Sequence, residues 1–279
     1  MLQKIEKTIK SPTGRDFSLD YRYPDLKKIK AVVLFAHGFK GFKDWGGFNA
    51  VAEEIASAGS LFIKFNFSHN GTDPENPVDF VDLKAFSENT FRKELMDYEE
   101  VLSFTEELMK EMGISTLPIY LMGHSRGGYT TILKALMDDR ITKAVAWAPV
   151  ADVKARFESN PQFQEWKKNG ISHILNGRTN QNMPLLFDLA EEVMTEPSFF
   201  DLKGRLEHTD LKLCCIHGTS DTSVPHTDSE KLYDWSFNTE LLIVEGADHT
   251  FGMVHPGTNE LPVDSMVAIE KTIHFFLDS

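Results

Sequence analysis

Residues 121–128 read Leu-Met-Gly-His-Ser-Arg-Gly-Gly, a serine set among small residues. A strand-like apolar run precedes this stretch, and the pattern over Arg126–Asp138 predicts a helix after it. At such a strand-to-helix turn, the G-x-S-x-G spacing of Gly123, Ser125 and Gly127 predicts a sharp bend that exposes the serine hydroxyl at the edge of a sheet. Glycine tolerates the close backbone approach that the bend requires. The chemistry expected of Ser125 is nucleophilic attack that forms an acyl-enzyme.

A serine nucleophile needs a base to take its proton and an acid to orient that base. Asp221 lies just after the strand-like run Leu211–Ile216, and His249 lies just after the run Leu241–Val244. The chain order serine, acid, histidine is the order found where the nucleophile stands on a strand-to-helix turn. These residues together predict a triad of Ser125, Asp221 and His249.

The negative charge of a tetrahedral intermediate needs two preorganised N–H donors. One donor is expected to be the backbone N–H of Arg126, directly after the nucleophile. The other is expected from the loop after the run Ala31–Ala36, which reads His-Gly-Phe over 37–39. The backbone N–H of Phe39 is assigned to this second place.

The elements that must position these residues alternate along the chain. An opening hairpin is expected from Leu2–Lys10 and Arg15–Tyr23, and after it short apolar runs alternate with helical patterns, which is typical of a mostly parallel sheet. The expected strands are Ala31–Ala36, Leu61–Phe67, Ile119–Met122, Ala144–Ala148, Leu211–Ile216 and Leu241–Val244. The expected helices are Phe48–Ala58, Arg92–Met112, Tyr129–Met137, Asp228–Trp235 and Val263–Leu277.

One segment, Val150–Asp210, breaks the alternation because it contains no strong core strand. Within it, Ile171–Leu175 and the turn residues 176–177 could form a small hairpin with the residues that follow. Leu185–Met194 has helical spacing. The simplest interpretation is a lid inserted between two core strands of one domain that spans residues 1–279, rather than an independent domain.

With these motifs in place, the chain resembles the α/β-hydrolase fold superfamily over nearly its whole length. The resemblance rests on the stretches 37–39, 123–127, 217–225 and 246–249, and it implies oxyanion, nucleophile, acid and base roles for them. The chain looks most like serine esterases and peptidases related to dienelactone hydrolases, acyl aminopeptidases and cinnamoyl (feruloyl) esterases. The resemblance implies an α/β fold: a mostly parallel eight-stranded sheet with helices on both faces and an inserted lid.

Other carboxylates compete with Asp221 for the role of the acid. Asp152 follows the expected strand Ala144–Ala148, where some members of this superfamily place the acid. Glu245 and Asp248 lie close to the proposed base. Asp221 is preferred because the stretch in which it stands is, by resemblance, the usual setting for the acid.

Other histidines compete with His249. His255 lies six residues downstream on the same loop and is the main alternative base. His37, His124 and His217 each stand beside a glycine at a strand end, where an imidazole more often braces a loop by hydrogen bonding. His249 is preferred because it is nearer to the end of its strand.

Arg126 stands where many elbows of the feruloyl type have glutamine. Its side chain is expected to hold a surface loop by ion pairing, with contact to substrate or to a lid carboxylate as the alternative. Several aromatic residues outside the strands could line an apolar acyl or aryl pocket, although packing within the lid explains them equally well. They are Trp45, Phe157, Phe163, Trp166, Phe187, Phe199 and Phe200.

The composition and the missing motifs argue against nucleic acid, a membrane, a metal ion and a cofactor as partners. The chain of 279 residues has a formal net charge of −13, with acidic residues spread along its length. Such a charge repels nucleic-acid backbones. No apolar run is long enough to span a membrane. The motifs typical of zinc and nucleotide sites are missing, so no metal and no cofactor are expected.

The first residues, 1–12, are charged and show no secretory signal, which favours the cytoplasm. Cys214 and Cys215 are adjacent within an expected strand, so their side chains should point to opposite faces and form no disulfide with each other. Both are expected to pack as small apolar side chains.

The function predicted from these residues is hydrolysis of carboxylic esters with small to medium acyl or aryl groups, acting on a small-molecule substrate. The alternatives are a peptidase or a thioesterase with the same triad, and a hydrolase-fold protein that binds a ligand without turnover. The triad does not separate these enzymes, because the leaving group and the shape of the pocket decide between them.

Overall fold

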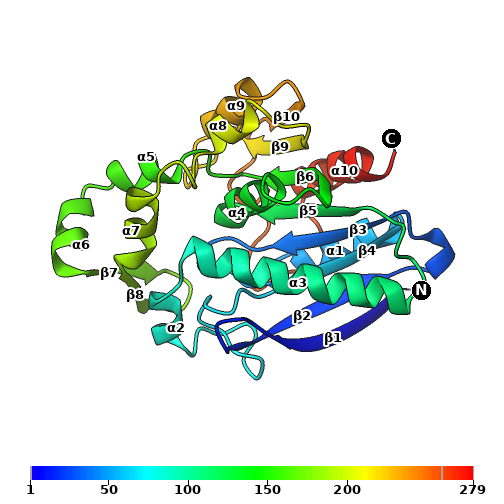
Figure 1. Ribbon diagram of the computed structural model, residues 1–279, viewed down its shortest axis with the longest axis horizontal. Helices are drawn as coiled ribbons and strands as arrows, with labels where there is room; N and C mark the ends of the chain where they lie inside the picture. The colour runs from blue at the N-terminus through cyan, green and yellow to red at the C-terminus, as the bar shows by residue number, and fades with distance from the viewer. Residues whose placement is uncertain (1, 259, 279) are drawn as a thin grey trace.

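The computed structural model describes residues 2–258 and 260–278, and a twisted sheet of eight strands runs through its centre (Figure 1). The strands of this sheet are β1 (Gln3–Lys10), β2 (Asp16–Tyr23), β3 (Ala31–Ala36), β4 (Ser60–Phe65), β5 (Ile119–His124), β6 (Ile141–Trp147), β9 (Lys212–Gly218) and β10 (Thr239–Val244). They are ordered β1-β2-β4-β3-β5-β6-β9-β10. Only the pairings of β2 with β1 and with β4 are antiparallel. The prediction of a mostly parallel eight-stranded sheet is confirmed.

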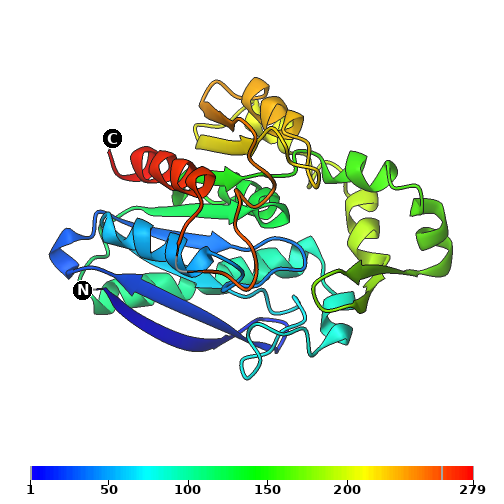
Figure 2. The same ribbon diagram turned by 180° about the vertical axis from the view of Figure 1, so that it is seen from behind.

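Helices cover both faces of the sheet. Figure 1 shows α3 (Phe91–Glu111) and α4 (Arg126–Ala135) on one face, with α9 (Thr227–Asp234) near the β9–β10 edge. Figure 2 shows α1 (Phe48–Ser57) and α10 (Val263–Leu277) on the other face. The two faces bury separate apolar clusters, as expected for a sheet that is covered on both sides.

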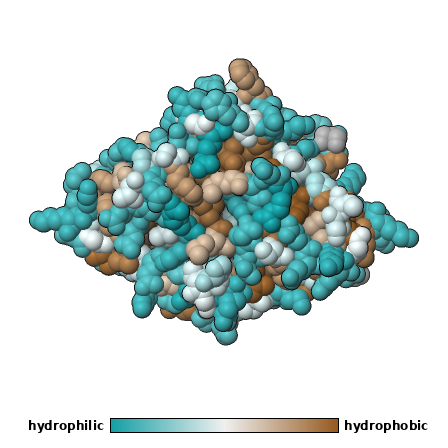
Figure 3. Space-filling model, in the orientation of Figure 1, coloured by the Kyte–Doolittle hydropathy of each residue, from teal (hydrophilic) through white to brown (hydrophobic). Residues whose placement is uncertain are grey.

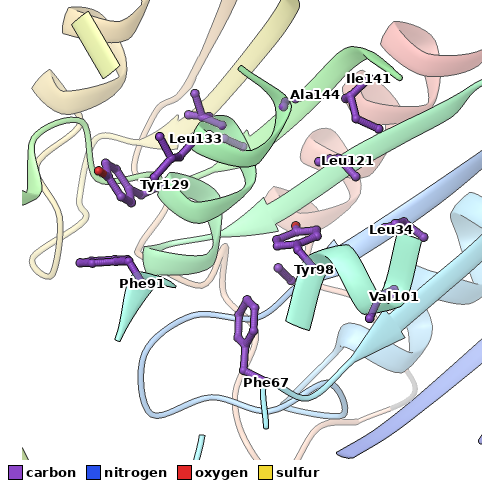
Figure 4. Close-up of a cluster of buried hydrophobic side chains, with 14 of the residues drawn as sticks. Leu34, Phe67, Phe91, Tyr98, Val101, Leu121, Tyr129, Leu133, Ile141 and Ala144 are labelled. Atoms are coloured by element: carbon purple, nitrogen blue, oxygen red, sulfur yellow. The ribbon is translucent and has the colours of Figure 1, made fainter. Parts of the chain in front are cut away.

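The central strands are buried on both faces, which explains why their sequences are almost continuously apolar. Every residue of β3, β4 and β5 is buried. Figure 4 shows Tyr98 and Val101 of α3 lying near Leu34 and Leu121 of the sheet. The Tyr98 hydroxyl also lies 2.6 Å from Thr131 Oγ1 of α4, so the two helices are joined by a buried hydrogen bond.

Several strands extend beyond the ranges expected from the sequence. β6 begins at Ile141 rather than at residue 144, because Ile141 pairs with Ile119 of β5 although polar residues interrupt the apolar run between 141 and 144. β5 continues to His124, which pairs with Trp147, and β9 continues to Gly218, which pairs with Val244. Ser125 therefore follows its strand directly.

The inserted segment 150–210 lies beyond one end of the sheet (Figure 1). It contains a separate two-stranded sheet, and the predicted hairpin is confirmed because Ile171 pairs with Leu186. The helix expected from residue 185 begins only at Asp188, since the two leucines before it belong to the hairpin. The elements are α5 (Val153–Glu158), α6 (Phe163–Asn169), β7 (Ile171–Asn176), β8 (Gln181–Leu186), α7 (Asp188–Thr195) and α8 (Leu202–Leu206).

Cys214 and Cys215 of β9 are both buried and both free, one in each apolar cluster. The expectation that they form no disulfide is confirmed.

The remaining short elements are a 3-10 helix over Leu26–Lys28 and α2 (Leu83–Ser87). None of the described helices combines the length and the apolar character needed to cross a membrane. Hydrophilic residues cover most of the face drawn in Figure 3, in keeping with the high net charge.

Candidate active site

Ser125 stands on the turn between β5 and α4 with φ 58° and ψ −124°, a backbone conformation that few residues other than glycine adopt. Its N–H donates to Trp147 O at 2.8 Å. A Cβ on Gly123 would lie 2.2 Å from Thr131 Oγ1, and a Cβ on Gly127 would lie 2.2 Å from His37 O. Both positions therefore require glycine, and the sharp turn predicted from the motif is present.

The structure brings Ser125, His249 and Asp221 together. His249 Nε2 lies 2.9 Å from Ser125 Oγ, and His249 Nδ1 lies 2.6 Å from Asp221 Oδ2. His249 stands on the loop after β10, and Asp221 stands on the loop after β9. The Asp221 carboxylate is fully buried, whereas 19% of the His249 side chain is exposed. The three residues thus form one continuous chain of hydrogen bonds, with Ser125 Oγ at one end and the buried Asp221 carboxylate at the other.

Four hydrogen bonds, including the one from His249, hold the Asp221 carboxylate. Oδ1 accepts from the backbone N–H groups of Ser223 and Val224, at 2.7 and 2.9 Å. Oδ2 accepts from His249 and, at 3.0 Å, from His217 Nε2. Burial alone would raise the pKa of Asp221, but the bonds from His217 and His249 lower it well below its ordinary value. Asp221 therefore carries its negative charge throughout the pH range in which proteins work.

His217 is fully buried under the acid, and its partners fix its tautomer. Its Nδ1 lies 2.7 Å from the Ser229 hydroxyl, and its Nε2 lies 3.0 Å from both Asp221 Oδ2 and Val224 O. Since the latter two atoms are acceptors, Nε2 carries the proton and Nδ1 accepts from Ser229. The sequence suggested that His217 braces a loop, and the structure adds that it holds the Asp221 carboxylate.

His124 holds the backbone of His249. Its Nε2 lies 2.8 Å from the backbone carbonyl of His249, and the centres of the two rings are 4.8 Å apart. Burial, together with a smaller effect of the neighbouring His249, lowers the pKa of His124 to about 3. A neutral His124 donates its Nε2 proton to that carbonyl and adds no second positive charge beside His249.

The rival residues have other roles. Asp152 accepts from Ala155 N and caps α5. Asp248 accepts from Thr250 N and Gly252 N in its own turn. Glu245 is exposed, and no contact joins it to His249 in the part of the chain that the structure describes.

His255 lines the same cavity as Ser125 but is held away from it. Its Nδ1 accepts from Gly46 N at 3.0 Å, and its ring stacks on Trp45 at 6.0 Å between centres. His37 also stands beside a glycine, as His124 and His217 do. Its Nε2 accepts from Phe67 N, and the side chain braces the loop after β3.

The loop after β3 packs directly against the serine. A Cβ on Gly38 would lie 2.9 Å from Ser125 Cβ, so the next residue, Phe39, is brought to the edge of the site. Over residues 2–258 and 260–278, neither the Phe39 nor the Arg126 backbone N–H donates to a protein acceptor. Both donors are thus available to a bound molecule.

A network of buried charges fixes the loop after β3 to the sheet. Lys43 on the loop and Lys64 on β4 donate to Asp20 Oδ2 of β2 at 2.8 and 2.6 Å, and both also pair with Asp44. The Lys43 backbone N–H donates to Asn66 Oδ1 at 2.6 Å. Breaking such a buried network by removing one partner costs about 3–5 kcal/mol, so the loop that presents Phe39 is firmly fixed.

A cavity of about 280 Å³ opens above Ser125. Its lining residues are Gly38, Phe39, Lys40, Gly41, Trp45, Phe48, His124, Ser125, Asn176, Arg178, His249, Thr250 and His255. The volume is near the lower end of the range for small-molecule sites. No group of three or more histidine, cysteine or acidic side chains within the described ranges is arranged to hold a metal ion.

The aromatic residues expected at the pocket are mostly elsewhere. Of the seven, only Trp45 lines the cavity, and Phe48 joins it from α1. The other six pack in or against the apolar cluster on the α3 and α4 side of the sheet. Their positions confirm the alternative that they pack within the insertion. The residues that sequence reasoning missed are Lys40, Asn176 and Arg178, which belong to no motif.

Arg126 forms an ion pair, but not with a surface loop. Its Nη2 lies 2.9 Å from Glu94 Oε1 of α3, and the side chain is only 11% exposed. The guanidinium lies over the ring of Phe91 at 4.5 Å and within 5.7 Å of the Phe39 ring. The expected surface-loop contact was wrong, because the partner Glu94 stands on a core helix. The positive charge of Arg126 also lowers the pKa of Glu192 on the insertion, and contact with substrate stays a prediction.

Comparisons with known proteins identify the family and the fold of the chain. Residues 84–261, more than half of the chain, match the model of the prolyl oligopeptidase family. The chain belongs to that family. Its fold is the α/β-hydrolase fold of serine-hydrolase type, and members of this fold class include esterases.

Solved structures share this fold at low sequence identity. Est1E from Butyrivibrio proteoclasticus with bound ferulic acid has a TM-score of 0.75 and 17% identity, over 98% of this chain and 100% of that one. Alpha/beta hydrolase domain-containing protein 10 from mouse has a TM-score of 0.67 and 18% identity, over 96% of each chain. A putative dienelactone hydrolase from Klebsiella pneumoniae has a TM-score of 0.63 and 14% identity, over 100% of each chain.

Proposed function

We propose that this member of the prolyl oligopeptidase family is a serine hydrolase that cleaves carboxylic esters of small to medium acyl or aryl groups. The observation that carries the proposal is the unbroken hydrogen-bond chain from Ser125 Oγ through His249 to Asp221. It lies under a cavity of about 280 Å³, a volume that suits a small molecule. The proposed reaction needs no cofactor.

In the proposed mechanism, His249 Nε2 takes the Ser125 proton as Oγ attacks the ester carbonyl. The Asp221 carboxylate holds the Nδ1–H and stabilises the imidazolium. The backbone N–H groups of Phe39 and Arg126 bind the oxyanion. His249 then gives its proton to the leaving alcohol, and water repeats the sequence to release the acid. Loss of one oxyanion donor typically costs 10²–10³-fold in turnover.

The family match makes peptide hydrolysis the second candidate. The cavity wall favours esters over peptides recognised by a free N-terminus, because no aspartate or glutamate in the described part of the chain lines the cavity to pair with an ammonium group. An ester also needs less protonation of its leaving group than an amide does.

The test is labelling with a fluorophosphonate probe, followed by activity assays on 4-nitrophenyl esters of rising chain length, hydroxycinnamate esters and aminoacyl anilides. We expect the native protein to be labelled and to hydrolyse the esters, and Ser125→Ala to do neither. Faster turnover of the anilides would make the peptidase the better assignment. A native chain that stays unlabelled and inactive, yet binds esters, would replace the enzyme with a binding protein.

A further inference from the structure

The polar residues on one part of the cavity wall are all hydrogen-bond donors. Lys40 comes from the loop after β3, and Asn176 and Arg178 come from the end of β7 and the turn that follows it. The chain has 42 acidic residues, and none over residues 2–258 and 260–278 lines this cavity. A protein with a net charge of −13 thus presents two cations and an amide inside its candidate active site. We call these three residues the donor wall.

Asn176 leaves a buried donor unused. Its side chain is 6% exposed, and its Oδ1 accepts from Arg178 N at 3.2 Å, which fixes the orientation of the amide. The amide nitrogen, Nδ2, has no hydrogen-bond partner. Buried side-chain donors are nearly always paired, so an unpaired one in a cavity wall points to a missing acceptor.

The two cations are also without carboxylate partners. Lys40 Nζ lies 3.4 Å from the backbone carbonyl of Leu175 and 5.9 Å from the centre of the Phe39 ring. Within the described ranges neither Lys40 nor Arg178 forms an ion pair. The Arg178 guanidinium lies over the rings of Phe42 and Phe80, at 5.3 and 5.6 Å. Stacking on two rings holds it at the cavity while its donors stay free.

The electrostatics at His255, a neighbouring wall residue, agree with this picture. Burial is the main cause of the lowered pKa of His255, and the charge of Arg178 lowers the pKa further. The exposed Asp79 raises the pKa of His255 by less than Arg178 lowers it. The positive charge of Arg178 thus reaches this part of the wall.

We propose that the donor wall binds a negatively charged group of the substrate, so that the preferred ester has an apolar body and one anionic end. The apolar body would lie against the remaining side of the cavity, where Phe39, Trp45 and Phe48 are placed. The anionic end would accept from Lys40, Asn176 and Arg178 while the carbonyl lies at Ser125. This inference rests on the proposed ester hydrolysis.

The first test compares pairs of esters that differ only in charge. For the acyl half, the pair is mono-4-nitrophenyl adipate and its methyl ester, and for the alcohol half it is 4-acetoxybenzoate and its methyl ester. In at least one pair we expect kcat/KM to be 10-fold or more higher for the anion. The ratio of anion to neutral ester should fall about 10-fold in Arg178→Gln and in Lys40→Gln. High salt should also lower the ratio of kcat/KM for the anion to kcat/KM for the neutral ester, because ions screen the attraction.

Two variants serve as controls. Arg178→Lys keeps the charge and should restore part of the preference. Lys168→Gln removes an exposed cation of α6 that does not line the cavity, and it should leave the ratio unchanged. Equal kcat/KM values within both pairs, or a preference that survives both donor-wall substitutions, would overturn the inference.

A binding test keeps this inference separate from the proposed chemistry. The Ser125→Ala protein is titrated by calorimetry with 4-phenylbutyrate and with its neutral methyl ester. We expect the carboxylate to bind at least 10-fold more tightly, and the difference to disappear when Arg178→Gln is added. This result would support the donor wall even if no ester were hydrolysed. Equal affinity of the two ligands would overturn the donor wall even if ester hydrolysis were established.

Discussion

Ser125, Asp221 and His249 stand directly after β5, β9 and β10, whereas the opposite side of the cavity is formed where the insertion hairpin meets the loop after β3. The first region, which we call the floor, is held by buried strands. The second, the donor wall, carries exposed or half-buried cations on a hairpin tip and a loop. Groups that must be placed to within about 0.5 Å belong on rigid elements. Groups that choose the substrate can stand on loops, which tolerate change.

This comparison predicts that changes in the floor lower activity on every substrate alike. The largest effect is expected for Asp221→Asn, which leaves the shape of the side chain intact but removes the charge that fixes the tautomer of His249. The corresponding change in a serine protease lowers kcat by about 10⁴-fold. We expect a loss of similar size here, equal for the charged and the neutral ester of each pair.

The matched control is Asp152→Asn. Asp152 caps α5, and asparagine caps helices about as well as aspartate. This variant should therefore keep kcat/KM near the native value. Near-native activity of Asp221→Asn together with a large loss in Asp152→Asn would move the acid to Asp152.

A smaller loss is expected for His217→Leu, which removes one of the hydrogen bonds to the Asp221 carboxylate. A hydrogen bond to a charged group contributes about 1.5–3 kcal/mol, so kcat should fall about 10- to 100-fold with little change in KM. His217→Gln can still donate near the position of Nε2 and should lose less. Steady-state kinetics on both members of an ester pair measure this, with thermal unfolding as the check on folding.

The His217→Leu variant also tests whether the floor and the donor wall act independently, the first on turnover and the second on substrate choice. A change in the ratio of anion to neutral ester in His217→Leu would show that the floor takes part in substrate choice. An unchanged kcat would show that the remaining bonds to Asp221 are sufficient.

The residues of the floor could be predicted from the sequence because the patterns that mark them are local. The glycines around Ser125, and an acid and a histidine directly after apolar runs, are each visible within a few residues. Their meeting follows from the parallel order of the strands, because the carboxyl ends of parallel strands lie at one edge of the sheet.

The donor wall could not be read in this way. Lys40 and Arg178 are 138 positions apart in the sequence, and they meet only because the hairpin docks on the loops through packing of Met183 with Phe42 and Phe80. Nothing near Asn176 marks it as different from any other turn asparagine. The partner of Arg126 was missed for the same reason, since Glu94 approaches it only through the packing of α3 against α4.

The smallest effect on activity is expected at the contact between the insertion and the core, where the predicted change is one of stability. Glu192 of α7 accepts from Phe91 N at 2.6 Å and from Arg92 N at 3.4 Å, at the first turn of α3. Burial raises the pKa of Glu192 from 4.5 to about 7, although these N–H groups partly oppose the rise. Between these two values the folded chain binds more protons than the unfolded chain, so the free energy of unfolding should decrease as pH rises through this window.

Glu192→Gln removes this titration while keeping an oxygen that can accept from Phe91 N. Near pH 5 the native protein and the variant should unfold at similar urea concentrations, because the native side chain is then mostly protonated. By pH 8 the variant should be more stable by up to about 3 kcal/mol. The control Glu191→Gln changes an exposed neighbour on α7 and should show no such trend. A native protein that gains stability over the variant between pH 5 and 8 would mean that the N-terminus of α3 favours the charged carboxylate more than burial disfavours it. The Glu192 carboxylate would then hold the insertion to the core as an anion at the N-terminus of α3. The contact would depend on a buried negative charge, as the floor does at Asp221.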